Sequence, residues 1–155
     1  MSHDPTISST QRLKSELVFL SELCRVVASN TEMQPILDWI AAKTTRMFGA
    51  DEGTIKLLGP ETSAPAVKTI VTRQSSGLSS GSWPQVVSMN VMGFLMTRGG
   101  TLATPDLSSD PRFTGLRDAT GRIRSVLAVP LRVDNRFTGM LAVTQSQPGR
   151  EWTED

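Results

Sequence analysis

The chain has 155 residues, 38% of them hydrophobic and 20% charged, with a formal net charge of +1, which is typical of one globular domain rather than a disordered segment. It has no basic excess and no tyrosine, and only 5% of its residues are aromatic, which argues against a nucleic-acid partner. No apolar run reaches the roughly 18 residues of a membrane span, and the polar N-terminus lacks a signal-peptide core. We therefore expect a cytoplasmic protein without membrane insertion.

The only cysteine, Cys24, and the only histidine, His3, exclude several kinds of chemistry. One cysteine cannot form an intrachain disulfide or a cysteine-cluster zinc site. A histidine in a polar tail is poorly placed for a catalytic triad or a haem ligand. The sequence also lacks phosphate-binding glycine motifs. We expect neither catalytic residues nor a metal site, and hence no enzyme.

Residues 1–10 read as a flexible tail, and residues 11–155 read as a single domain that begins with a helix over 11–29. Two apolar stripes run along this helix. The first has spacings of four and three residues, typical of a helix–helix seam, and consists of Leu13, Leu17, Leu20, Cys24 and Val27. The second lies beside it and consists of Phe19, Leu23 and Val26. Such a helix either lies in a deep groove of its own domain or gives one stripe to a partner chain. We favour the second, a homodimer through this helix.

A second helix is predicted from about Thr31 to Phe48. Its start is ambiguous, because Thr31 and Gln34 fit a capping box while Pro35 favours a start near Gln34. Asp110 followed by Pro111 is typical of a helix N-terminus. The further elements predicted before the last hairpin are strands over 54–58 and 67–73, a long loop over 74–84, a helix over 86–98, a strand over 101–104 and a short helix over 111–118.

The strongest local pattern is a β-hairpin, formed by strands over 124–133 and 136–145 around the turn residues Asp134 and Asn135. In this register Pro130 faces Gly139. Alternate residues on both faces are apolar, so both sides of the sheet must be covered. The hairpin is therefore expected in the middle of a central antiparallel sheet of five to six strands. With helices on either side, the fold class is α/β (α+β), a three-layer α/β/α sandwich.

The sequence resembles the GAF domain, a small sensor module of signalling proteins, over about residues 15–155. Four patterns carry the resemblance, in family-like order and spacing: ILDWIAAKTTRMFGAD (36–51), TPDLSSDPRF (104–113), IRSVLAVPL (123–131) and FTGMLAV (137–143). The resemblance implies a GAF/PAS-like fold whose closing helix is truncated at EWTED. It also implies an output domain in the full-length protein, such as a kinase, phosphatase, cyclase or transcription activator of a two-component system.

Specialised branches of the family do not fit these residues. The bilin branch needs a cysteine near the ligand, whereas Cys24 lies in the first helix. The haem branch needs a histidine in its cavity, and the methionine-sulfoxide reductase branch uses several cysteines. The signature of the cyclic-nucleotide branch cannot be placed. No cofactor is therefore assigned, haem and bilin are disfavoured, and an unidentified small molecule remains as the ligand.

The resemblance places a ligand cavity between the sheet and the short helices after the second strand. The candidate ligand-binding residues are Trp83, Ser88, Asn90, Asp106, Arg112, Phe113, Ser125 and Leu127. Trp83 could instead pack at the base of its loop, Asp106 could cap the following turn, and Arg112 could be a solvated residue.

Two functions follow from these expectations. In the first, the domain is a regulatory sensor whose ligand shifts a conformational equilibrium that the terminal helices transmit to the output domain. In the second, the domain binds no ligand and serves dimerisation or protein interaction. Its cavity would then be filled by Met89, Met92, Phe94 and Met96.

Overall fold

The computed structural model describes residues 5–29, 32–58, 67–74 and 83–152. Its elements are α1 (Pro5–Ser29), α2 (Met33–Met47), β1 (Glu52–Leu58), β2 (Val67–Gln74), α3 (Gln85–Arg98), β3 (Leu102–Thr104), the 3-10 helix η1 (Pro111–Phe113), β4 (Ser125–Val133) and β5 (Arg136–Gln145). Among the helices of these ranges, none combines the length and apolar character needed to cross a bilayer.

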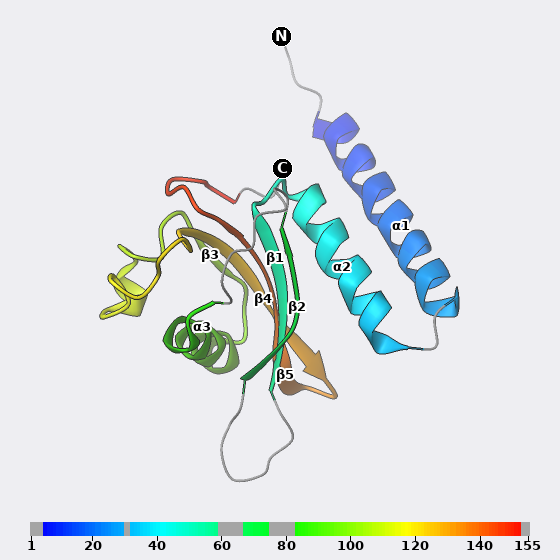
Figure 1. Cartoon of the computed structure of the whole chain (residues 1–155). Coiled ribbons are helices and arrows are strands. Elements are labelled where there is room, and N and C mark those ends of the chain that lie inside the picture. Colours follow the sequence, from blue (N-terminus) through cyan, green and yellow to red (C-terminus); the bar gives the residue numbers. More distant parts are fainter. Residues whose placement is uncertain (1–4, 30–31, 59–66, 75–82, 153–155) are drawn as a thin grey trace.

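The five strands form one sheet in the order β2-β1-β5-β4-β3, and every neighbouring pair is antiparallel. Helices α1 and α2 lie on one side of the sheet and α3 lies on the other (Figure 1). The expected α+β class, an antiparallel sheet with helices, is confirmed. The hairpin β4–β5 lies inside the sheet, because β1 pairs with the outer side of β5 and β3 pairs with β4.

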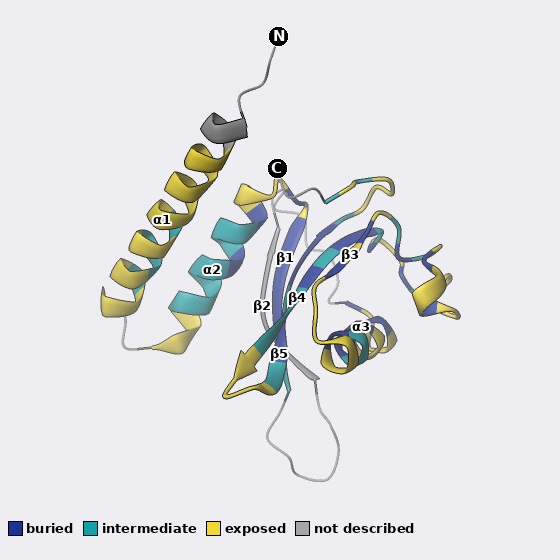
Figure 2. Cartoon of the chain, turned by 180° about the vertical axis from the view of Figure 1, so that it is seen from behind, coloured by how far each residue is buried: buried dark blue, intermediate teal, exposed yellow. Residues whose placement is uncertain are grey.

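The two faces of the sheet belong to two hydrophobic clusters, and alternate residues of β1, β4 and β5 enter opposite clusters. Leu131 and Leu141 pack on the α2 side, around Ala41 and Ile55. The larger cluster, on the α3 side, includes Val87, Val91, Leu95, Val126, Ala128, Met140 and Ala142. Buried residues accordingly follow β1, β4 and the inner side of α3, whereas α1 is exposed along most of its length (Figure 2).

The turn of the hairpin follows the prediction, but the register does not. Asp134 and Asn135 have φ values of 49° and 62°, as a two-residue type I′ turn requires. Pro130 pairs with Met140, and Gly139 pairs with Leu131, so the predicted pairing of Pro130 with Gly139 is wrong. The register shifts between Leu131 and Arg132, where a β-bulge places one extra residue, Thr138, on β5.

Gly139 is required by the neighbouring strand β1 rather than by Pro130. A Cβ atom at this position would lie 2.2 Å from the backbone oxygen of Lys56 and 2.8 Å from Cδ2 of Leu57. On the same strand, a Cβ atom at Gly53 would lie 2.0 Å from Oγ1 of Thr45, in α2. Glycines thus allow β1 to lie very close to β5 on one side and to α2 on its face.

Several helix boundaries differ from the prediction. α1 begins at Pro5, so residues 5–10, which the sequence places in a tail, continue the helix; proline is well tolerated in a first turn, where its missing N–H is not needed. α2 begins at Met33 after the N-cap Glu32, which forms no side-chain cap, and Thr31 lies outside the described residues. This start agrees better with the interpretation based on Pro35.

The short helix predicted over 111–118 is reduced to η1. Asp110 does cap it, accepting a hydrogen bond from the backbone N–H of Arg112, and Pro111 takes the expected first position. The helix ends early because the backbone of Thr114 is extended, with a ψ of 129°, and Gly115 follows with a φ of 95°; both lie outside the right-handed helical region. The long loop predicted over 74–84 falls largely outside the described residues.

Candidate functional site

A row of polar side chains lies on the α3 side of β1, a face to which β4 and β5 contribute mainly apolar residues. Glu52, Thr54 and Lys56 are spaced by two residues, so they share one face of the strand, and all three are buried. They pair across to Thr144, Ala142 and Met140 of β5, the last two of which belong to the α3-side cluster. A buried charged row on a covered sheet face is unusual, because ionised groups are costly to remove from water.

Lys56 is the central group of this row. The residue is only 2% exposed, and its Nζ atom lies 5.8 Å from the ring centroid of Trp83, close enough for a cation–π contact. Burial lowers the pKa of Lys56, and the carboxyl group of Glu52 partly opposes this by raising it. The Nζ atom of Lys56 thus lies near an indole ring, and the carboxyl group of Glu52 on the same strand favours its charged form.

Two buried polar atoms at the start of α3 have no hydrogen-bond partner. They are Nε1 of Trp83 and Oγ of Ser88, in residues that are 4% and 2% exposed. An unsatisfied buried polar group costs about 1–3 kcal/mol, so such groups need an explanation. The N-cap of α3, Pro84, supplies no side-chain hydrogen bond, and the first turn contains no acidic residue.

We call Lys56, Trp83 and Ser88 the β1–α3 site. Of the residues expected to bind a ligand, Trp83 and Ser88 lie in it. Phe113 is buried in the same hydrophobic cluster as Trp83, with its ring 5.5 Å from that of Phe94. Lys56 was missed by the sequence analysis, although one signal for it exists. Glu52, Thr54 and Lys56 alternate with the period of a strand that was expected to be covered on both faces.

Asp106 is engaged within the protein. Its two carboxylate oxygens accept hydrogen bonds from Nε and Nη2 of Arg124, each at 2.9 Å, and Oδ1 also accepts from the backbone N–H and hydroxyl of Ser108. The Arg124 guanidinium holds the pKa of Asp106 far below its usual range. This geometry corresponds to the alternative in which Asp106 caps the following turn.

Arg112 is likewise engaged. Its guanidinium donates to both oxygens of Asp110, the closest contact being 2.6 Å from Nη2, and to the backbone oxygen of Ala103. It also lies over the ring of Phe94, 5.4 Å from the centroid. The hydrogen bond from Arg112 lowers the pKa of Asp110 to about 2.

The other expected residues lie apart from the β1–α3 site. Asn90 is exposed and donates to the backbone oxygen of Val86. Leu127 is half-buried on the opposite face of the sheet, since it alternates with Val126 and Ala128 of the α3-side cluster. Among the four expected cavity fillers, Met92 and Phe94 pack inward, but Met89 and Met96 are exposed. The prediction that all four fill the interior is therefore wrong, because only part of α3 faces the sheet.

Ser125 joins three segments at the far end of the sheet. Its Oγ atom lies 2.7 Å from the backbone oxygen of Pro105 and 2.9 Å from that of Gln147, and it accepts a hydrogen bond from the backbone N–H of Arg150. The Arg150 side chain in turn donates to the backbone oxygens of Phe48 and Gly49, at the end of α2. We call this arrangement the Ser125–Arg150 clasp.

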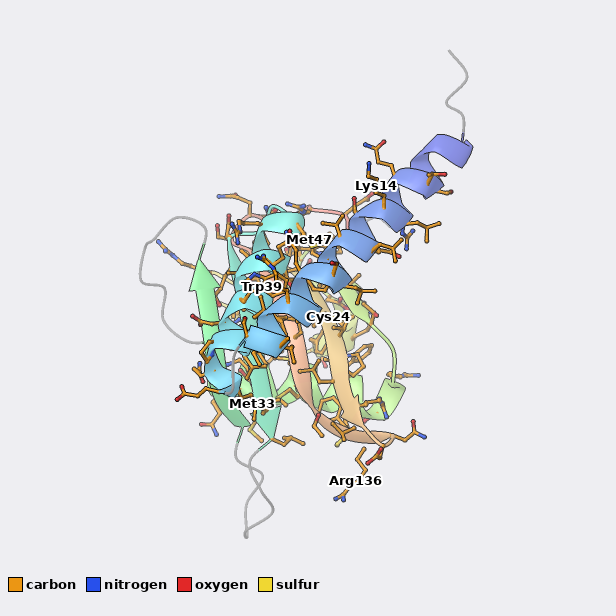
Figure 3. The ribbon with its side chains drawn as sticks, turned by 90° about the vertical axis from the view of Figure 1, so that its right-hand side faces the viewer. Lys14, Cys24, Met33, Trp39, Met47 and Arg136 are labelled. Atoms are coloured by element: carbon orange, nitrogen blue, oxygen red, sulfur yellow. The ribbon has the colours of Figure 1, made fainter. Side chains whose placement is uncertain are left out.

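The exposed surface of α1 is the other candidate functional feature. Phe19 stacks on Trp39 of α2, with ring centroids 5.7 Å apart, and Lys43 donates to Glu22 at 2.6 Å. The first stripe, which contains Leu17 and Cys24, remains exposed, so α1 does not lie in a groove of its own domain. Figure 3 views α1 in front of α2, with Cys24 and Trp39 labelled.

The order of these elements agrees with a known family. The sequence model of the GAF domain matches residues 32–155. The chain belongs to the GAF domain family. No match was found among curated proteins. In the described part of this GAF domain, no three His, Cys, Asp or Glu side chains gather in a way that could hold a metal ion.

Solved structures support the fold of this GAF domain. A free methionine-R-sulfoxide reductase from Neisseria meningitidis, solved with its substrate, is 21% identical, with a TM-score of 0.61 over 84% of this chain and 73% of that one. The GAF domain of an Acinetobacter phosphoenolpyruvate-protein phosphotransferase is 19% identical, with a TM-score of 0.61 over 90% and 82%. The GAF domain of the cyanobacteriochrome TePixJ is 20% identical, with a TM-score of 0.60 over 81% and 80%. At these identities the likeness concerns the fold alone.

Proposed function

We propose that this GAF domain is the regulatory sensor of a cytoplasmic signal-transduction protein and has no catalytic activity of its own. It binds a small ligand between β1 and the start of α3, and the terminal helices transmit the change to an output domain. The observation that carries this proposal is the pair of buried, unpartnered atoms, Nε1 of Trp83 and Oγ of Ser88. A protein that keeps such groups buried gains free energy when a ligand satisfies them.

Membership of the GAF family supports the regulatory role, and two of the similar structures are GAF domains of a phosphoenolpyruvate-protein phosphotransferase and a cyanobacteriochrome. The placement of the β1–α3 site supports a ligand on this side of the sheet. A ligand transmits a signal only if it favours one of two conformations of the domain over the other. A ligand in the β1–α3 site would contact both a strand of the sheet and the first turn of α3, so it could favour one position of α3 relative to the sheet.

A thermal-shift screen of the whole chain with cyclic nucleotides, 2-oxoacids, amino acids and haem tests the proposal. A ligand at 100 times its dissociation constant adds about 2.7 kcal/mol of stability, which raises Tm by roughly 5–11 °C for a domain of this size. Ser88→Ala should reduce the shift caused by any ligand found. Asn90→Ala, on the exposed side of the same helix, is the matched control and should not. The proposal fails if a broad library produces no stabilisation.

The exposed stripe of α1 favours a second function, dimerisation. We propose that two copies of the chain pair through Leu13, Leu17, Leu20, Cys24 and Val27. The four–three spacing is that of a coiled-coil seam, and Leu17 is 66% exposed in the single chain. The second stripe, which begins with Phe19, faces α2 through the contact with Trp39, so the helix has one side for its own domain and another for a second copy.

Light scattering on the chain with Leu17→Glu and Leu20→Glu tests this pairing. Buried charges would separate the helices, so the double variant should be monomeric where the unchanged chain is dimeric. Val18→Glu is the control, because Val18 is also exposed, at 48%, but lies on another side of the helix, about 100° from Leu17. Dimers that survive the double substitution, or are lost with Val18→Glu, would contradict the assignment.

A further inference from the structure

We propose that the ligand of the β1–α3 site carries an anionic oxygen group, a carboxylate or a phosphate, which binds at Lys56, Trp83 and Ser88. This inference rests on the proposed sensor function and adds the chemical class of the ligand. The functional groups of the site themselves point to this class. An indole N–H and an ammonium group can only donate hydrogen bonds, and a hydroxyl group can donate or accept.

A complementary ligand must therefore supply acceptors. Two of the three groups, Nε1 of Trp83 and Oγ of Ser88, have no acceptor within the protein. The third, Lys56, brings an ammonium group near Trp83, with its Nζ atom 5.8 Å from the centroid of the ring. A neutral acceptor such as a carbonyl group would satisfy the hydrogen bonds, but only an anion also complements the buried charge.

The surroundings of the site favour negative charge as well. Trp83 and Ser88 stand on either side of the first residue of α3, a helix of 14 residues with no side-chain cap and no acidic residue in its first turn. The N-terminus of such a helix carries a partial positive charge and backbone N–H groups that favour anions. Here it does not stand alone, because two buried, unpartnered side chains flank it.

Glu52 is the acidic group on the same face of the site's strand. It lies four residues before Lys56, a separation of roughly 13 Å along the strand, and its charge favours the ammonium form of Lys56. An anion bound near Trp83 would act on the pKa of Lys56 in the same direction as Glu52. Both negative charges would thus favour the ammonium form of Lys56 and oppose the effect of burial, which lowers this pKa.

The test compares anionic probes with neutral counterparts on the whole chain. 2-Oxoglutarate is paired with its dimethyl ester, cyclic AMP with adenosine, and inorganic phosphate is added alone, which separates carboxylate from phosphate as the source of the charge. Binding is measured by calorimetry and thermal shift. We expect at least one anionic probe to bind and its neutral counterpart to bind at least tenfold more weakly.

Lys56→Met keeps the length of the side chain and removes its charge. It should weaken the anionic probe by roughly 10- to 100-fold, as expected for losing a hydrogen bond to a charged group, while affecting the neutral counterpart little. Lys14→Met, in exposed α1, is the control and should leave both unchanged. A Lys56→Met variant that binds the anion as tightly as the unchanged chain would overturn the inference.

A spectroscopic readout is independent of how well the Lys56 variant folds. The chain has three tryptophans, so a proton–nitrogen spectrum of the unchanged protein contains three indole N–H signals, and Trp83→Phe identifies the one from Trp83. The anionic probe should move this signal downfield, because the indole N–H gains an acceptor. A probe that binds without moving it overturns the inference.

The two proposals fail in distinguishable ways. If neutral ligands bind as well as anions, and Ser88→Ala weakens them, the sensor function stands and the anionic class is wrong. If no compound in the broad screen binds, both the sensor function and the ligand class are wrong.

Discussion

Replacing Gly139 by alanine tests the closest approach between strands in this fold. The added methyl group would lie 2.2 Å from the Lys56 backbone oxygen, 2.8 Å from Leu57 Cδ2 and 3.0 Å from Leu57 Cα. The first and last of these are backbone atoms, which cannot move aside by rotating a side chain. Strand β1 must therefore shift away from β5, the strand at the centre of the sheet.

The expected cost combines two opposing effects. Overpacking a well-packed interior costs about 1–3 kcal/mol or somewhat more, whereas replacing glycine stabilises by about 0.4–1 kcal/mol through the unfolded chain. The net loss should be about 1–2 kcal/mol, which lowers Tm by roughly 2–8 °C in a domain of this length. Because the shift occurs at Lys56, the variant should also bind an anionic probe more weakly than the unchanged chain.

Gly93→Ala provides the matched control. Gly93 lies within α3, and a Cβ atom there would meet nothing within 4 Å. The same substitution should stabilise the protein by up to about 1 kcal/mol, because alanine is the better helix former. Urea and thermal unfolding of both variants give the comparison. A Gly139→Ala protein as stable as the unchanged chain would refute the argument that this contact fixes the distance between β1 and β5.

Three further outcomes are expected. The pKa of Asp110 is lowered to about 2 by its hydrogen bond from Arg112. Between about pH 4 and 2 the unfolded chain therefore binds a proton that the folded chain does not, and the free energy of unfolding should fall by about 1–2 kcal/mol as the pH drops through this range. Asp110→Asn should flatten that part of the pH profile of urea unfolding, and an unchanged slope would contradict this reasoning. Asp106→Asn should lower the free energy of unfolding in urea by about 1–2 kcal/mol, because it breaks the two-point contact with Arg124. A double-mutant cycle with Arg124→Gln that shows no coupling would rule out this ion pair as the cause of the loss. Gly115→Ala should lower the free energy of unfolding by about 1–2 kcal/mol in the same assay. The cause would be backbone strain alone, since the φ of Gly115 is 95° and no atom lies within 4 Å of an added Cβ atom. An unchanged free energy of unfolding would show that the turn changes its conformation to accommodate alanine.

The sequence predicts best those features that neighbouring residues determine. The hairpin turn depends on Asp134 and Asn135, which tolerate positive φ, and the start of η1 depends on Asp110 and Pro111. These signals are local, and they place the two strands and the cap correctly. The early end of η1 comes from the extended backbone of Thr114 before Gly115, whose conformational freedom allows either a helix or a break, so the composition of 111–118 alone could not decide it.

Features that depend on distant parts of the chain could not be predicted in this way. The bulge at Thr138 shifts the register by one residue, and the need for glycine at position 139 comes from β1, far away in the sequence. The β1–α3 site is also formed by distant segments. Trp83 and Ser88 were identifiable as candidates near a loop, but the proximity of Lys56 follows only from the packing of α3 over the sheet. Asp106 and Arg112 have partners within the fold that the spacing did not reveal.

The Ser125–Arg150 clasp has a mechanical consequence. The Arg150 guanidinium connects the backbone after β5 to Phe48 and Gly49, directly after α2, and Ser146 adds two hydrogen bonds to Asp51. A displacement of β5 would therefore act directly on the C-terminal end of α2, without first rearranging the hydrophobic interior. Chains of hydrogen bonds are one of the physical networks through which coupling passes between distant elements of a fold.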